Sequence, residues 1–294
     1  MNYRNILPLV SNVTTSSTDN WNDFGSWCDG TIWYEKTPTY TSRVTAYATA
    51  TGITDYTILD PLNIFDLGLT YYGLDTIMKA VYPMVTDKTS QSDMANQMKY
   101  NFMNPLDTNP AFRLNWVGGW IYSRTGALPN GTNAYADTFL TPSTALSLNS
   151  THISFYSRTD NNGSWDMGCN ISTPGTRRLE LLCKSSSTSF YGVNSSTESS
   201  ISNTNGTGLY IANRTSSTIH QLIKNNTINS TSASSVGLPT RTVFIGGGNL
   251  DGGNLYGSKQ CAFSSIGDGL TDFQADIFSS LVNNLQKALN RDVY

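Results

Sequence analysis

A run of short alternating segments occupies the chain from about residue 109 onward and constrains the fold more than any other feature. Apolar and polar residues alternate in 153–156 and in 179–184, as expected for strands with one buried face. Turn-forming clusters such as 129–131 and 173–175 separate these segments. Because no helical pattern interrupts them, we predict a mainly β fold, an antiparallel jelly-roll β-sandwich.

A small helical region precedes the strands. Apolar residues recur at three- and four-residue steps after Asp60 and Pro61, which predicts a helix that Asp60 caps and Gly73 ends. The same pattern predicts short helices over Asp75–Val81 and Gln91–Phe102. We therefore expect a separate segment over 1–45, the helical region over 46–104 and the sandwich over 105–294.

The best-specified element is an amphipathic helix at the C-terminus, from about Thr271 to Leu289. Thr271 and Gln274 form a T-x-x-Q capping box. One apolar stripe follows, made of Phe273, Ile277, Phe278, Leu281, Val282, Leu285 and Leu289. This stripe is expected to lie against the sandwich.

Composition excludes several classes of function. Lys and Arg number 18 against 21 Asp and Glu, so the chain has no basic footprint for nucleic acid. No apolar run is long enough for a membrane span, and no signal peptide is evident. Cys28, Cys169, Cys183 and Cys261 form no C-x-x-C pair, so we expect buried or free thiols and assembly in a reducing cytoplasm.

Motifs for catalysis are missing. The glutamates are Glu35, Glu180 and Glu198, and they form no E-x-D-x-x-E run like that of sandwich glycosidases. A G-x-S-x-G elbow is absent, and His152 and His220 are expected to be structural. We therefore expect no catalytic residue, no cofactor and no enzyme. The alternative is a glycan depolymerase that assembles a pair of aspartates across loops.

Two loops are candidates for ligand binding. The glycine-rich loop GGGNLDGGNLYG, 246–257, offers hydrogen-bonding groups and a stacking face for a sugar in Asn249, Asp251, Asn254 and Tyr256. A second loop offers Trp165 and Asp166, with Asp160 nearby. A calcium site at Asp251 and Asp268 matches no loop code, so no metal is expected. The alternative for the first loop is a flexible strand connection, and for Trp165 a place in the core.

Several segments resemble bacteriophage virion proteins that carry a concanavalin A-like, laminin-G-like sandwich of the lectin/glucanase type. They are ATGITDYTILDPLNIFDLGL (50–69), IMKAVYPMVTDK (77–88), YNFMNPLDTNPAFRLNWVGGW (100–120), NGTNAYADTFLTPS (130–143) and KQCAFSSIGDGLTDFQADIFSSLVNNLQKALNR (259–291). The resemblance covers about residues 45–294 and leaves the first 45 outside it.

What the resemblance implies is a virion structural protein, either a head fibre or capsid decoration protein or a tail fibre component. It implies host attachment through a surface glycan, contacts with other virion proteins and assembly in the host cytoplasm, but no particular ligand. Many weak sites act better together, so we expect a homo-oligomer. The aromatic residues Trp21, Phe24, Trp27, Trp33 and Tyr34 are candidates for anchoring to the virion or for oligomerisation. A purely architectural sandwich without a ligand remains a further alternative.

Overall fold

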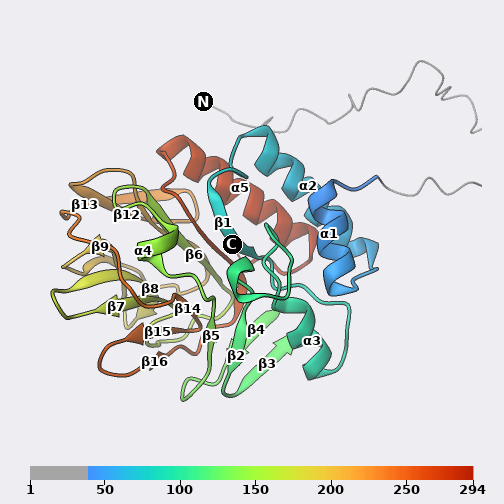
Figure 1. Ribbon diagram of the computed structural model, residues 1–294, viewed down its shortest axis with the longest axis horizontal. Coiled ribbons are helices and arrows are strands. Elements are labelled where there is room, and N and C mark those ends of the chain that lie inside the picture. Colours follow the sequence, from blue (N-terminus) through green and yellow to red (C-terminus); the bar gives the residue numbers. More distant parts are fainter. Residues whose placement is uncertain (1–38, 294) are drawn as a thin grey trace, which may run out of the picture. The chain divides into compact units, whose positions relative to one another are not determined.

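The computed structural model of this chain describes residues 39–293, and their strands form two facing sheets (Figure 1). The predicted antiparallel β-sandwich, with a C-terminal helix and a small helical region before it, is confirmed. The candidate anchoring residues Trp21, Phe24, Trp27, Trp33 and Tyr34 lie outside the described residues.

The first sheet, sheet A, contains eight strands among the described residues. Its order is β13 (Thr227–Ser232), β12 (Ile219–Lys224), β11 (Gly208–Arg214), β6 (Thr151–Ser157), β17 (Cys261–Gly267), β4 (Gly126–Pro129) and β3 (Trp120–Ser123), with β1 (Met78–Tyr82) paired to β17. Every pairing in sheet A is antiparallel.

The second sheet, sheet B, contains nine strands in the same part of the chain. Its order is β10 (Ser199–Ser202), β9 (Thr188–Ser195), β8 (Arg177–Ser185), β7 (Met167–Ile171), β14 (Phe244–Ile245), β5 (Tyr135–Asp137) and β2 (Asn115–Val117). β15 (Gly247–Leu250) runs parallel to β7, and β16 (Leu255–Tyr256) pairs with β15. Alternate side chains of both sheets, such as Phe155 on β6 and Leu181 on β8, meet in one apolar core.

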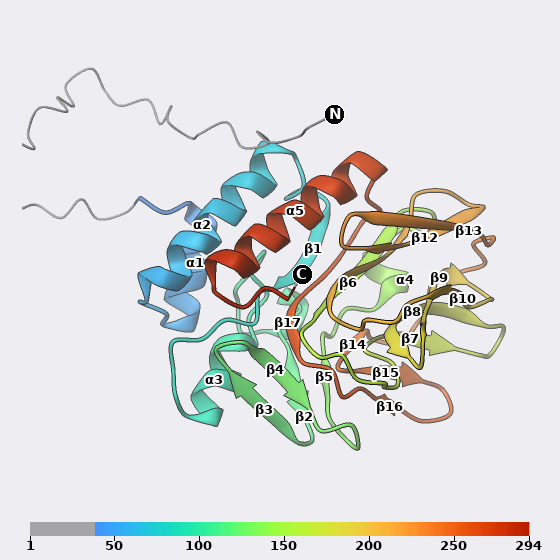
Figure 2. The same cartoon turned by 180° about the vertical axis from the view of Figure 1, so that it is seen from behind.

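Helices cover the outer face of sheet A. The helices are α1 (Ser42–Thr51), α2 (Tyr56–Tyr71), α3 (Gln91–Met98), α4 (Pro142–Ala145) and α5 (Asp272–Ala288), with a 3-10 turn at Asn109–Ala111. Figures 1 and 2 both show α1, α2 and α5 on the side of sheet A, away from β7 to β10 of sheet B. Among the described residues, no helix is long and apolar enough to cross a membrane.

The C-terminal helix α5 is the element that the sequence predicts best. The Thr271 hydroxyl accepts the backbone N–H of Gln274, and the Gln274 side chain accepts that of Thr271, so the capping box is complete. The ring of Phe278 lies 6.0 Å from that of Phe263 on β17. Phe273 departs from the prediction, because it is 67 % exposed in the first turn.

The two long helices pack closely where α2 carries a glycine. A side-chain carbon added to Gly68 would lie 2.4 Å from a methyl carbon of Leu281. The missing side chain therefore lets α2 and α5 approach each other.

The predictions for the helical region need correction at three places. Helix α2 begins at Tyr56, because Asp55 rather than Asp60 is its cap, and Pro61 lies inside it. The predicted helix Asp75–Val81 is wrong, since Met78–Tyr82 pairs with β17 as a strand. Here a tertiary contact overrides the local pattern. Helix α3 ends at Met98, four residues before the predicted end.

We expect Phe278→Ala to destabilise the protein much more than Phe273→Ala. Phe278 is fully buried between α5 and sheet A, so its loss should lower the free energy of unfolding by about 3–5 kcal/mol. The exposed Phe273 is the matched control, with an expected change below about 0.5 kcal/mol. Urea denaturation of the full chain measures both, and equal losses would contradict the packing of α5 on sheet A.

Candidate functional site

The two loops predicted to bind a ligand lie next to each other. A side-chain carbon added at Gly248 would lie 3.2 Å from Cβ of Trp165, and one added at Gly257 would lie 2.9 Å from the carbonyl oxygen of Trp165. The segment around Trp165 therefore packs on the hairpin of β15 and β16. Trp165, Asn254 and Tyr256 are all half-buried there.

Asn249 and Asp251 are bonded within this hairpin region. The guanidinium of Arg241 donates to Oδ1 of Asn249 at 2.9 Å and to Oδ1 of Asp251 at 2.7 Å. The backbone N–H of Ser172 donates to Oδ2 of Asp251 at 2.7 Å. The bonds from Arg241 and Ser172 lower the pKa of Asp251 to about 2. These hydrogen bonds hold the hairpin against the end of β7. Ligand binding by Asn249 and Asp251 stays a prediction.

Asp166 forms a buried ion pair. Its Oδ2 lies 3.3 Å from Nζ of Lys259, and both side chains are at most 1 % exposed. The backbone N–H of Cys183 donates to the same oxygen at 2.8 Å, and Nζ of Lys259 donates to the carbonyl of Lys184 at 3.0 Å. Burial raises the pKa of Asp166, although Lys259 lowers it. The pair, with its bonds to Cys183 and Lys184, thus joins β8 to the segment before β7. A ligand contact by Asp166 stays a prediction.

The carboxylates considered for calcium are engaged in separate ion pairs. Asp251 pairs with Arg241, whereas Asp268 lies 3.1 Å from Nζ of Lys79. Within residues 39–293, no cluster of three or more His, Cys, Asp or Glu side chains is placed to hold a metal ion.

The histidines and the described cysteines are structural. Nδ1 of His152 lies 2.6 Å from the carbonyl of Asp268, and Nε2 of His220 lies 2.7 Å from Oγ of Ser199. Burial lowers the pKa of each histidine to about 4, so both are neutral at physiological pH. Cys169, Cys183 and Cys261 are free and buried, as predicted, while Cys28 lies outside the described residues. Burial raises the pKa of these three thiols, which makes them unreactive.

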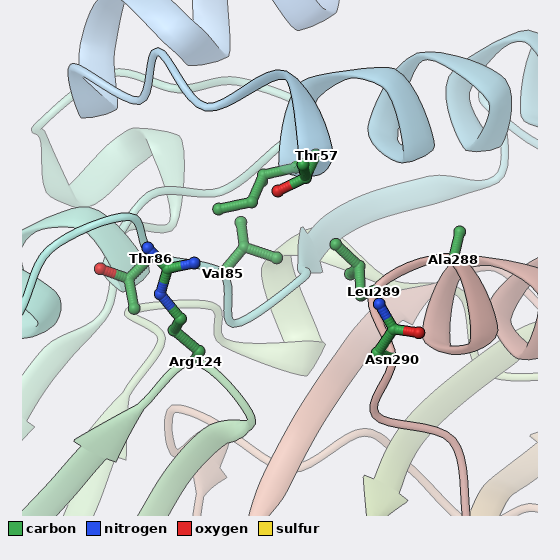
Figure 3. A pocket seen from close by; sticks show the side chains of 8 residues that line it. Thr57, Val85, Thr86, Arg124, Ala288, Leu289 and Asn290 are labelled. Carbon is green, nitrogen blue, oxygen red and sulfur yellow. The ribbon is translucent and has the colours of Figure 1, made fainter.

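A small pocket opens between the start of α2, the turn joining β3 to β4, and the end of α5 (Figure 3). Its volume is about 140 Å³, about the size of a cavity that holds one benzene. Its lining residues are Thr57, Ile58, Val85, Thr86, Arg124, Ala288, Leu289 and Asn290. They include no carboxylate, histidine or cysteine, and the cation Arg124 already faces Asp55 at 3.6 Å. The pocket therefore offers no catalytic group.

The outer face of sheet B gathers a different set of polar groups. Strand pairing aligns Asp137 on β5, Phe244 on β14, Gly168 on β7, Glu180 on β8 and Gly192 on β9 in one row. The neighbours of these residues along each strand point into the core. The row therefore faces outward, because side chains alternate along a strand.

Arg178 and Glu180 form the centre of this face. Nη1 of Arg178 donates to Oε1 of Glu180 at 2.8 Å, and the amide of Asn170 donates to Oε2 at 3.2 Å. Glu180 is only 1 % exposed, whereas the side chain of Arg178 is 26 % exposed. A side-chain carbon at Gly192 would lie 3.0 Å from Cβ of Arg178 and 3.2 Å from Oε1 of Glu180. A larger residue than Gly192 would therefore crowd the pair.

Arg178 acts to lower the pKa of two carboxyl groups, those of Glu180 and Glu198. The pKa of Glu180 is raised to about 8. Burial is the largest cause and the charge of Glu198 adds to it, while Arg178 and Asn170 act in the opposite direction. Burial also raises the pKa of Glu198, in the turn between β9 and β10, while Arg178 lowers it. Perturbed carboxyls beside an arginine occur at functional sites and also in structural ion-pair networks.

An aromatic pair borders the same face. The rings of Tyr135 on β5 and Phe244 on β14 stack with centroids 4.1 Å apart and an angle of 11°. Between this pair and Glu180 lies β7, which presents Gly168 in the row and Asn170 two residues later. We call Tyr135, Asn170, Arg178, Glu180 and Phe244 the sheet B site.

The sequence contains one signal for this site that motif searching misses. Arg178 and Glu180 are two residues apart in β8, so both lie on the same face, opposite the core residues Leu179 and Leu181. The predicted strand, 179–184, includes Glu180 but not Arg178. An outward carboxylate in a strand is unremarkable by itself. Only the pairing with β7 and β9 brings Asn170, Gly168 and Gly192 around it.

No protein-family model matches the sequence, and no curated protein matches it. Solved structures with a similar fold include a Trypanosoma rangeli sialidase in complex with sialic acid, at 11% identity and a TM-score of 0.48 over 68% of this chain. Domain 4 of a GH43 extracellular arabinanase from Geobacillus stearothermophilus, in complex with arabinotriose, has 12% identity and a TM-score of 0.45, covering 69% of this chain and 98% of that domain. The botulinum neurotoxin serotype D binding domain has 9% identity and a TM-score of 0.42, covering 70% of this chain and 52% of that domain.

These structures correct one expectation from the sequence. The prediction that the protein is not an enzyme is wrong as a firm exclusion, because the similar structures include a sialidase and part of an arabinanase, which are glycosidases. The chain spans only 32% of the sialidase. At 9–12% identity the likeness concerns the sandwich alone and assigns neither an activity nor a ligand.

Proposed function

We propose that this protein is a virion-surface protein that binds a glycan at the sheet B site. The observation that supports glycan binding is the pair of partly exposed side chains Arg178 and Asn170, which both donate hydrogen bonds to the buried Glu180. The stacked rings of Tyr135 and Phe244 lie beside them. Guanidinium, amide and carboxyl groups are planar donors and acceptors that pair with sugar hydroxyls, while an aromatic ring packs on the apolar face of a sugar.

The dimensions of the face suit a sugar ring. Neighbouring strands lie about 4.8 Å apart, so Phe244 and Glu180, two strands apart, are separated by roughly 10 Å across the sheet. Gly168 lies between them and projects no side chain into that space. Phe244, Gly168 and Glu180 are themselves buried, so in this proposal the sugar contacts the partly exposed Tyr135, Asn170 and Arg178.

The virion part of the proposal rests on the sequence resemblance of residues 45–294 to phage proteins. In this proposal the chain is a head fibre, decoration or tail fibre component, and other virion proteins are its partners. The aromatic residues Trp21, Phe24, Trp27, Trp33 and Tyr34 are proposed to anchor it. Glycan binding by the sandwich then serves attachment to the host surface.

Glycoside hydrolysis is a second candidate function, and the pair Glu180 and Glu198 favours it. A glycosidase needs one protonated carboxyl to donate to the leaving oxygen and one carboxylate as base or nucleophile. Glu180, with a pKa of about 8, is protonated at neutral pH and suits the first role. Glu198 is the candidate for the second role. This assignment replaces the pair of aspartates considered from the sequence, and it requires Arg178 to move off Glu180 when substrate binds.

The protonation of Glu180 predicts a pH dependence of stability. Its pKa rises from 4.5 to about 8 on folding, so the folded state holds the proton more tightly. The stability from this group is fully present below about pH 4.5 and is lost as the pH rises through about 8. Relative to Glu180→Gln, the wild-type free energy of unfolding should fall by about 3–5 kcal/mol over this range. Urea denaturation at several pH values tests this, and parallel pH profiles for the two proteins would contradict it.

Glycan binding should depend on the shape of the Arg178 side chain as well as on its charge. We expect Arg178→Lys to weaken binding to a glycan array of bacterial surface oligosaccharides at least about tenfold, because an ammonium cannot reproduce the guanidinium fork. Asn254→Ala, in the predicted glycine-rich loop, is the control and should change binding less than about twofold. If Asn254→Ala weakened binding about tenfold and Arg178→Lys did not, the ligand would bind at the glycine-rich loop instead. Release of reducing ends from the bound glycan, abolished by Glu198→Gln, would identify hydrolysis.

Virion location has its own test. We expect the chain to co-purify with phage particles through a density gradient and to remain accessible to antibody on intact particles. Mass spectrometry of the particle fraction and immunogold labelling measure the two properties. A chain found only among the proteins that do not sediment with particles would refute the virion proposal, while leaving glycan binding to be decided by the array.

A further inference from the structure

Helix α2 carries apolar side chains on two opposite faces. One face, which includes Leu62, Phe65 and Leu69, is buried against the rest of the protein. The opposite face carries four large exposed side chains, Tyr56 (56 % exposed), Ile64 (57 %), Leu67 (41 %) and Tyr71 (72 %). At about 100° per residue, these four fall within an arc of roughly 80°. A helix that is apolar on both faces is expected to be covered on both.

We call Tyr56, Ile64, Leu67 and Tyr71 the α2 stripe. Among the described residues, the other large exposed apolar side chains are scattered over separate elements; they are Leu106, Ile121, Ile219, Val236 and Phe273. Single exposed apolar residues are normal on a protein surface. The α2 stripe is different because its members share one face of a single helix and together expose an area on the order of 400 Å², with Asp60 between Tyr56 and the other three. Contiguous patches of this size mark sites of interaction.

The stripe is complementary to a second copy of itself. Asp60, Ile64, Leu67 and Tyr71 follow one another at steps of four, three and four residues. This spacing is the same in both directions, so a two-fold axis at the midpoint brings Ile64 of one helix opposite Leu67 of the other. The same axis brings Tyr71 opposite Asp60. The centre of such a pair is apolar on both sides, and each flank joins a phenol O–H donor to a carboxylate acceptor.

The charges of α2 are compatible with this arrangement. Tyr56–Tyr71 contains no Lys or Arg, and its exposed charge on this face is Asp60, which already accepts the hydroxyl of Tyr40 at 2.8 Å. Eleven residues separate Asp60 from Tyr71. In the antiparallel pair, the two Asp60 carboxylates are therefore about 16 Å apart along the axis, beyond the screening length of about 8 Å at physiological ionic strength. Their repulsion does not oppose the pairing.

We propose that the α2 stripe is the interface of a homodimer in which two α2 helices pack antiparallel about a two-fold axis. Two stripes bury on the order of 800 Å² in total, and the surrounding side chains bring the area toward the lower limit of specific interfaces, about 1,200 Å². We therefore expect dimerisation at micromolar concentrations rather than an obligate dimer. The interface goes beyond glycan binding and does not depend on it, although two linked sheet B sites would bind a surface with higher avidity.

The first experiment measures the oligomeric state of the full chain by sedimentation from low to high micromolar concentration. We expect a monomer–dimer equilibrium for the wild type. The double variant Ile64→Lys with Leu67→Lys should raise the dissociation constant at least about 100-fold, because four ammonium groups would be buried. Ile219→Lys replaces an exposed isoleucine on β12 and is the matched control, expected to dimerise like the wild type. Circular dichroism verifies that each variant is folded.

A second experiment tests the antiparallel register by disulfide formation. In a Cys28→Ser background, the other cysteines are buried, so an introduced thiol reports on its own position. A mixture of Ile64→Cys and Leu67→Cys chains should form a linked heterodimer faster than either chain links to itself. Self-linking of Ile64→Cys at an equal rate would overturn the antiparallel pairing.

Three further outcomes would overturn the homodimer. They are a wild-type chain that is monomeric at every concentration, a dimer that survives the double lysine variant, and an oligomer with an odd number of chains. Protection of the Ile64→Cys thiol from an alkylating reagent in a monomer would mean that another part of the chain covers the stripe. Loss of dimerisation without loss of glycan binding would leave the proposed function intact.

Discussion

The arrangement of this protein depends on sheet A being buried on both faces. One face of β6 contributes Ile153 and Phe155 to the core between the sheets, and the other carries His152 and Ser154 beneath the helices. Phe278 of α5 lies over this second face, with its ring 6.0 Å from that of His152. The polar side chains on this face hydrogen-bond one another. Oγ of Ser265 lies 3.0 Å from Nε2 of His152 and 2.7 Å from Oγ of Ser154. The result is a three-layer arrangement of helices, sheet A and sheet B.

This asymmetry gives the two outer surfaces different properties. Among residues 39–293, no long helix packs on the outer face of sheet B (Figures 1 and 2). Tyr135, Asn170 and Arg178 are partly exposed on this face, whereas Glu180 and Phe244 are only 1 % and 5 % exposed. The helical layer covers sheet A but leaves its own apolar stripe on α2 facing outward. The proposed glycan site and the proposed dimer interface therefore lie on different elements, and a change at one surface need not disturb the other.

Several elements follow from local chemistry. The capping box at Thr271 and the apolar stripe after it predict α5 to within one residue at each end, because cap and stripe act within the helix itself. The alternating segments 153–156 and 179–184 lie within the strands β6 and β8. The sequence instead predicts a short helix over Asp75–Val81, but Met78–Tyr82 pairs with β17 as a strand. Local pattern decides an element only where no partner strand competes.

The sequence by itself determined that this chain is a sparsely charged, strand-rich sandwich closed by a C-terminal helix, because alternation, turn residues and caps are local signals. Tertiary structure alone decided which polar residues meet. Gly168, Glu180 and Gly192 are far enough apart in the chain that only strand register aligns them, and burial of Glu180 follows from that alignment. It also decided that Asp166 pairs with Lys259, because the two residues come from distant segments. Side-chain environment is a property of packing, and packing is not local.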